Sequence, residues 1–148
     1  MDEKTICLFE KKLDYSFKNK QLLQIALTHK TYAFESMETI EYNERLEFLG
    51  DSILNFVIAE MLYQKNMFFS EGELTRRRAK YVNNSRLAEK AKELQIGDFL
   101  MLGKGEIKQN GHLTPSNLAN SMEALFGAIY LDSNLDTVKK IIKRIVVN

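Results

Sequence analysis

The segment from Ser116 to Leu131 constrains the fold most, because it is apolar on nearly every side at helical spacing. A helix of that kind has to lie at the centre of a protein, surrounded by other elements. Its only formal charge is Glu123, and Asn120 lies one turn earlier on the same face. Burial of a lone carboxylate costs several kcal/mol unless the group is paired or bound to a metal ion. The sequence therefore predicts a central helix whose single acidic group needs a positive partner.

A second helix is predicted from Asn43 to about Tyr63, and it carries two different stripes. Glu44, Glu47 and Asp51 lie three and four residues apart, so they share one face. Like charges at this spacing destabilise a helix by roughly 0.2–0.5 kcal/mol per pair, and Gly50 in mid-helix costs about 1 kcal/mol more. Such a face is either simply solvated or presents carboxylates to a cation. The predicted core stripe consists of Leu46, Leu49, Ile53, Phe56 and Val57.

The two helices together offer a set of oxygen ligands: Glu47 and Asp51 on one, Asn120 and Glu123 on the other. Oxygen ligands without Cys or His at ligand spacing select hard cations such as Mg²⁺ or Mn²⁺. Carboxylate-held cations of this type suit phosphodiester hydrolysis, because the metal activates a water and neutralises charge on the phosphate.

A basic run on a further predicted helix fits the same chemistry. Arg76, Arg77 and Lys80 lie mostly on its outer face, where they would position backbone phosphates.

Each of these features also has a simpler structural explanation. The acidic stripe and the basic run can both be solvated helix faces. Glu123 can form a structural ion pair with Arg45 or Arg86. Phe48 and Phe56 are core or interface residues by default. The spacing by itself leaves these alternatives open.

The totals indicate one all-α domain. A chain of 148 residues suits a single hydrophobic core, and no strand pattern or internal repeat is present. The net charge of +1 means that nucleic-acid binding would need local charge or a second module. The single cysteine, Cys7, suits a reducing cytoplasm and is expected to fill the core. No apolar run reaches the ~18 residues of a membrane span, so no membrane partner is expected.

Shorter helices are expected at 6–13, 20–28, 71–83, 84–94 and 135–146. Asn19 is the expected cap of the helix at 20–28, Thr114 is the expected cap of the central helix, and Ser70 with Glu73 forms a predicted capping box. Residues 29–42 and 103–112 are expected to be loops, the first with one short helical turn.

The stretch from Asn43 to Leu54 resembles the signature of the ribonuclease III family, the bacterial endonucleases of double-stranded RNA, without a gap. The resemblance continues through 70–75, 103–106 and 122–132, so it covers essentially the whole chain. It implies one all-helical endonuclease domain over 1–148 that works as a homodimer and holds duplex RNA in a valley between subunits. It also implies cleavage of both strands to 5′-phosphates and short 3′ overhangs, in the processing of rRNA and mRNA precursors.

The resemblance implies a metal centre at four positions. Glu47, Asn120 and Glu123 would hold one Mg²⁺, and Asp51, sharing Glu123, would help to hold a second, with a metal-bound water as the nucleophile. Asp51 and Glu123 are therefore the expected catalytic residues, and Mn²⁺ is expected to substitute. The family usually has Asp where this chain has Asn120. The missing charge predicts weaker Mg²⁺ binding, with activity that needs more metal or prefers Mn²⁺.

Outside that centre, Glu44 and Glu71 match acidic positions near the RNA and the valley. Phe48 matches an aromatic position that inserts into the partner subunit. Bacterial members usually carry a C-terminal domain that binds double-stranded RNA and would supply much of the phosphate binding. Either the chain belongs to such a protein or it is a compact form. Two other functions stay open: a non-catalytic dimeric RNA-binding module with an impaired centre at Asn120, and a purely structural helical dimer.

Overall fold

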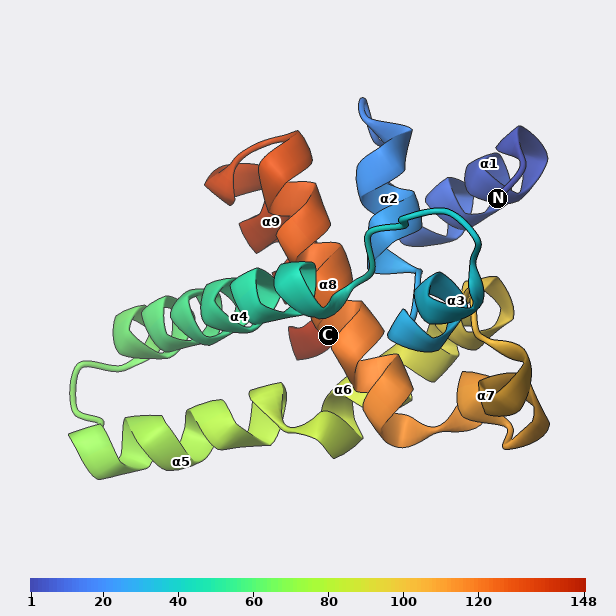
Figure 1. Ribbon diagram of the computed structural model, residues 1–148. Coiled ribbons are helices and arrows are strands. Elements are labelled where there is room, and N and C mark those ends of the chain that lie inside the picture. Colours follow the sequence, from blue (N-terminus) through green and yellow to red (C-terminus); the bar gives the residue numbers. More distant parts are fainter.

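The computed structural model describes residues 1–148 and consists of helices without a β-strand, as the sequence predicted (Figure 1). Thr28 and Met101 form one isolated parallel bridge. Short 3₁₀ turns occupy Ile96–Phe99 and Gly111–Leu113, and a π-helical turn, Lys143–Val147, ends the fold. The α-helices are α1 (Glu3–Leu13), α2 (Lys20–Ala26), α3 (Lys30–Glu35), α4 (Glu44–Lys65), α5 (Glu71–Val82), α6 (Asn84–Glu93), α7 (Lys104–Lys108), α8 (Pro115–Asp132) and α9 (Leu135–Ile142).

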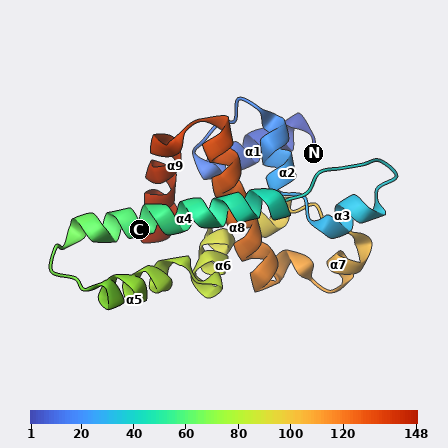
Figure 2. The ribbon, with the colours of Figure 1, turned by 60° about the vertical axis from the view of Figure 1, so that its left-hand side comes forward.

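Helix α8 lies at the centre of the molecule, as its apolar sequence predicted. Every residue from Asn117 to Ile129 is buried except Asn120. Helices α2, α4, α6 and α9 all pack against it, and α4 crosses it in both views (Figures 1 and 2). The core is therefore built around the helix that carries Glu123.

Two glycines allow α4 and α8 to cross at very short range. A Cβ atom on Gly50 would lie 1.7 Å from the backbone oxygen of Glu123, and one on Gly127 would lie 2.4 Å from that of Leu46. Since van der Waals contact forbids such distances, no side chain fits at either point. The helix-propensity penalty of Gly50 thus has a packing reason.

Helices α4 and α5 form a long antiparallel hairpin that projects from one side of the molecule (Figures 1 and 2). The predicted capping box of Ser70 and Glu73 is present at the start of α5. No residue of α5 is fully buried, and Ala79 is exposed. The basic residues of α5 consequently reach solvent.

Several local predictions were wrong. Cys7 is exposed rather than in the core, and Phe56 is 49% exposed. Thr114 makes no side-chain cap for α8, whereas Asn19 caps α2 as expected. The two burial errors have one cause: periodicity identifies the apolar face of a helix but not how much of that face its neighbours cover.

Two segments that were expected to be loops, the first with one short helical turn, contain helices. Helix α3 lies within 29–42 and α7 within 103–112. The backbone N–H of Lys104, which opens α7, donates to Glu35 of α3 at 2.9 Å. Both helices are too short to show a helical repeat of apolar residues in the sequence. Tertiary contacts of this kind therefore determine whether they form. No helix is both long and apolar enough to span a membrane.

Candidate metal centre

The crossing of α4 and α8 places Glu47, Asp51 and Glu123 on one side of the molecule's central helix pair. Glu47 and Asp51 flank Gly50, which itself contacts the backbone of Glu123. The side chains span a range of environments: Glu123 is buried, Glu47 is half-buried and Asp51 is exposed. The close approach of the two helices therefore creates an acidic cluster that opens from the core to solvent.

Burial and neighbouring negative charge act on the protonation of Glu123 and Glu47. Burial, followed by the charges of Asp51 and Glu47, raises the pKa of Glu123 to about 8. Burial, followed by the charges of Glu44 and Asp51, also raises the pKa of Glu47, while Lys30 acts in the opposite direction. Both shifts reflect burial first and nearby negative charge second.

No ion pair compensates this cluster. None of the six ion pairs of the structure includes Glu47, Asp51 or Glu123. The structural alternative, a pair of Glu123 with Arg45 or Arg86, is not formed. Arg86 instead donates to the backbone oxygen of Val146 at 3.1 Å.

This donor set fits a hard divalent cation. All its ligand atoms are oxygens, and the excess negative charge at a partly buried position is what such a cation would neutralise. Asn120 is half-buried one turn before Glu123 and adds an amide oxygen. No group of three or more acidic, histidine or cysteine side chains lies at metal-binding spacing in the structure. The carboxylates would therefore have to rotate toward one another to share a cation.

The other two acidic positions lie outside the cluster. Glu44 pairs with Lys30, with 3.0 Å between Oε1 and Nζ, although its charge still acts on Glu47. Glu71 begins α5 at the far end of the hairpin and accepts a hydrogen bond from Thr75 at 3.1 Å. Neither Glu44 nor Glu71 is therefore a candidate metal ligand.

Phe48 is one of the residues that line an apolar groove. Its side chain is 79% exposed, and the groove, of about 830 Å³, is lined by eight hydrophobic residues among twelve. Ile40, Leu49 and Leu131 contribute to it from a loop and two helices. Sequence analysis missed the groove, because no spacing along one element signals a surface assembled from several. A large exposed aromatic in the wall of such a groove is typical of an interface.

The structure brings together two of the three basic residues that were singled out. Arg77 and Lys80 line a common cleft near the end of α4, and the guanidinium of Arg77 also stacks on Phe69 at 4.0 Å from the ring centre. Arg76 is exposed but does not line this cleft. Two further cations, Lys65 and Arg86, also line the cleft. Their proximity to Arg77 and Lys80 was not predicted, because they belong to helices other than α5.

Comparison with known proteins agrees with the helical arrangement. Residues 19–148 match a family model described as ribonuclease-III-like. Ribonuclease 3 of Nitrosomonas eutropha is 47% identical over 135 residues, which cover 91% of this chain and 53% of that protein. Ribonuclease 3 of Buchnera aphidicola is 50% identical over 133 residues, which cover 90% of this chain and 56% of that protein. The chain thus spans about half the length of the curated relatives it matches.

A solved structure gives the same result for the fold. It is the nuclease domain of ribonuclease III from Campylobacter jejuni, described for flexibility in a region involved in dimer formation. The match has a TM-score of 0.87 at 39% sequence identity and covers 93% of each chain.

Proposed function

This chain belongs to the ribonuclease III family, and on that premise we propose that it is an endoribonuclease that hydrolyses double-stranded RNA with divalent metal ions. The observation that carries the chemistry is the uncompensated cluster of Glu47, Asp51 and Glu123 at the α4–α8 crossing. Such a cluster is unfavourable in a purely structural protein, because Glu123 and Glu47 lose solvation and the neighbouring carboxylates repel them.

In the proposed centre, Glu47, Asn120 and Glu123 hold one Mg²⁺ or Mn²⁺, and Asp51 with Glu123 helps to hold a second. When bound, these ions supply a water of lowered pKa as the nucleophile and positive charge for the scissile phosphate. The buried α8 fixes the direction from which Glu123 reaches the site. The more exposed Asp51 faces the solvent side, from which the RNA arrives, and α4 holds it there.

We further propose a homodimer with two cutting centres, one for each strand, which leaves 5′-phosphates and short 3′ overhangs. The exposure of Phe48 within the wall of the apolar groove supports this assembly, with Phe48 of one subunit packing into the groove of the other. Glu44 and Glu71 would border the RNA valley, and Arg76, Arg77 and Lys80 would contact the backbone. The expected substrates are rRNA and mRNA precursors in the cytoplasm.

Neither the structure nor the comparisons favour the non-catalytic alternative. Asn120 keeps an oxygen at its position, and the chain retains Glu123, the carboxylate that is most unfavourable to bury.

The proposal is tested with a duplex RNA and the matching single strand, each incubated with Mg²⁺, Mn²⁺ or EDTA. We expect cleavage of the duplex only, and only with metal. Glu123→Gln keeps the shape of the side chain but removes its charge. Since loss of a residue that merely supports a metal ligand costs 10–100-fold, loss of a direct ligand should reduce cleavage by more than about 100-fold. Glu3→Gln, at the exposed start of α1, is the matched control, and full-rate cleavage by Glu123→Gln would refute the assignment.

A further inference from the structure

A second concentration of charge lies between the end of α4, α5 and the start of α6, away from the carboxylates. A cleft of about 290 Å³ is lined there by Leu62, Lys65, Arg77, Lys80, Tyr81 and Arg86. Four of these six residues are cationic and none is acidic. Like charges that face one small cleft repel one another, so the arrangement becomes favourable when an anion lies among them.

The protein itself leaves most of these charges unpaired. Lys65, Arg77 and Lys80 take part in none of the ion pairs of the structure. Arg86 approaches Glu89 only to 3.5 Å. The cleft therefore keeps at least three positive charges available to a ligand.

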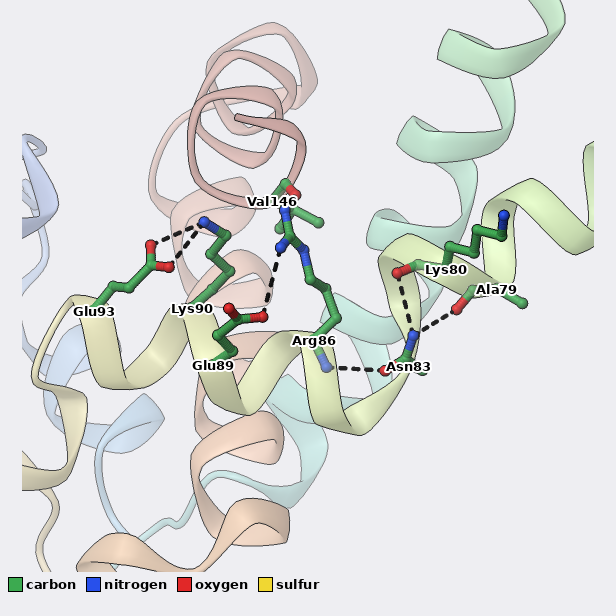
Figure 3. A network of polar contacts seen from close by, with 8 residues as sticks. All are labelled: Ala79, Lys80, Asn83, Arg86, Glu89, Lys90, Glu93 and Val146. Atoms are coloured by element: carbon green, nitrogen blue, oxygen red, sulfur yellow. Dashed lines mark hydrogen bonds and ion pairs between the residues drawn. The ribbon is translucent and has the colours of Figure 1, made fainter.

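The turn between α5 and α6 holds the cleft in shape (Figure 3). The side-chain amide of Asn83 donates to the backbone oxygens of Ala79 at 2.9 Å and Lys80 at 3.2 Å. Its oxygen accepts the backbone N–H of Arg86 at 2.9 Å. The Arg86 guanidinium is in turn anchored on the backbone of Val146. The backbone positions of Lys80 and Arg86 are thus fixed relative to each other, and the Arg86 guanidinium is held in place, which lowers the entropy lost when a ligand binds.

The cationic groups that line the cleft and its distance from Asp51 indicate which ligand it binds. Ammonium and guanidinium groups together bind oxyanions, and arginine favours phosphate. Lys65 lies fourteen residues after Asp51 on α4, or about 21 Å along the helix at 1.5 Å per residue. A phosphate in the cleft is therefore too far from Asp51 to be the one that is hydrolysed.

We propose that this cleft is a phosphate-binding site that holds the backbone of duplex RNA at a distance from the cutting centre. Lys65 and Arg86 belong to it together with Arg77 and Lys80. That the ligand is RNA rests on the proposed function, whereas phosphate binding by the cleft does not.

The first experiment uses inorganic phosphate as the probe, added to the 148-residue chain and followed by amide NMR shifts. We expect saturable shifts around Lys65, Lys80 and Arg86. They should disappear in Lys65→Gln/Lys80→Gln. The control, Lys4→Gln/Lys11→Gln, removes the same charge from exposed positions on α1, across the molecule from α5 (Figures 1 and 2). It should keep the shifts.

The second experiment measures binding of a duplex RNA by fluorescence anisotropy in EDTA over a range of salt concentrations. The cleft variant should bind about tenfold more weakly, with a salt slope that is smaller by about 1–2 units. The control variant should keep the wild-type slope.

The outcomes separate the two claims. Phosphate that shifts the wild type and the cleft variant alike would overturn the site. Phosphate binding that is lost in the cleft variant, with RNA affinity and salt slope unchanged, would overturn RNA as the ligand in favour of a free phosphate. A wild-type chain that neither binds nor cuts duplex RNA would contradict the proposed function and the RNA assignment, while the phosphate titration would still decide the site.

Discussion

Gly50 of α4 faces the backbone carbonyl of Glu123 in α8 so closely that a Cβ atom on Gly50 would lie 1.7 Å from that oxygen. The helix that supplies Glu47 and Asp51 is thus set against the helix that supplies Glu123 by direct backbone contact. Any side chain at position 50 would separate the two halves of the candidate centre.

We predict that Gly50→Ala destabilises the protein by about 3 kcal/mol, near the upper end for overpacking, because the new methyl group meets rigid backbone. Its better helix propensity would offset only about 1 kcal/mol. Urea unfolding followed by circular dichroism measures the change. Gly72→Ala is the matched control: it lies in α5 with nothing within 4 Å of its Cβ position, so it should be neutral or slightly stabilising. Equal stability of the two variants would show that the crossing can relax.

The raised pKa of Glu123 predicts a pH dependence of stability. The folded pKa of about 8 lies above the ordinary value of 4.5, so the folded state holds a proton that the unfolded state releases. Below about pH 4.5 the group has no effect, and between about 4.5 and 8 its contribution lowers stability as the pH rises. The shift of Glu47 acts in the same direction. Denaturant unfolding in EDTA at a series of pH values should show a smaller decline in Glu123→Gln than in Glu3→Gln, and identical declines would contradict the shift.

Restoration of a carboxylate at position 120 should strengthen metal binding. We expect Asn120→Asp to lower the Mg²⁺ concentration for half-maximal cleavage by about tenfold, since charge count sets the affinity of oxygen sites. In EDTA the same variant should be less stable than the wild type, because a further negative charge joins the cluster. The measurement is the initial cleavage rate against Mg²⁺ and Mn²⁺ concentration for both proteins. Superimposable curves would show that position 120 does not hold the metal.

Phe48→Ala should weaken self-association without unfolding the chain. The side chain is 79% exposed, so its removal leaves the core of one subunit intact. Aromatic anchors at interfaces contribute about 2 kcal/mol or more, which corresponds to roughly a 30-fold rise in the dissociation constant. Sedimentation equilibrium tests this, with Phe68→Ala as control because Phe68 is 85% exposed in the α4–α5 loop, away from the groove. A similar loss of dimer in both variants would contradict a specific role for Phe48.

The central features were predictable because each lies within one helix. Burial of α8 and the isolation of Glu123 follow from composition around a single helical axis. The exposure of Cys7 and Phe56 was not predictable, since it depends on where neighbouring helices end. Gly50 appeared in the sequence only as a penalty, and its reason became clear from the partner backbone.

The cleft was harder still to predict from sequence. Lys65 and Arg86 lie in different helices from Arg77 and Lys80, and no spacing rule relates them. They come together only because α5 folds back on α4 and the Asn83 turn leads directly into α6.

Asn120 is the one residue between Asn117 and Ile129 of α8 that is not buried. This exposure affects which substitutions the protein can tolerate. All the other residues from Asn117 to Ile129 are buried in the core, so substitutions at those positions disturb packing. Asn120 itself is only half-buried, and we propose it as a ligand of the candidate centre. Its charge can therefore be altered without repacking the core, and under the proposed metal assignment the metal preference can change through one residue while the packing of the fold stays constant.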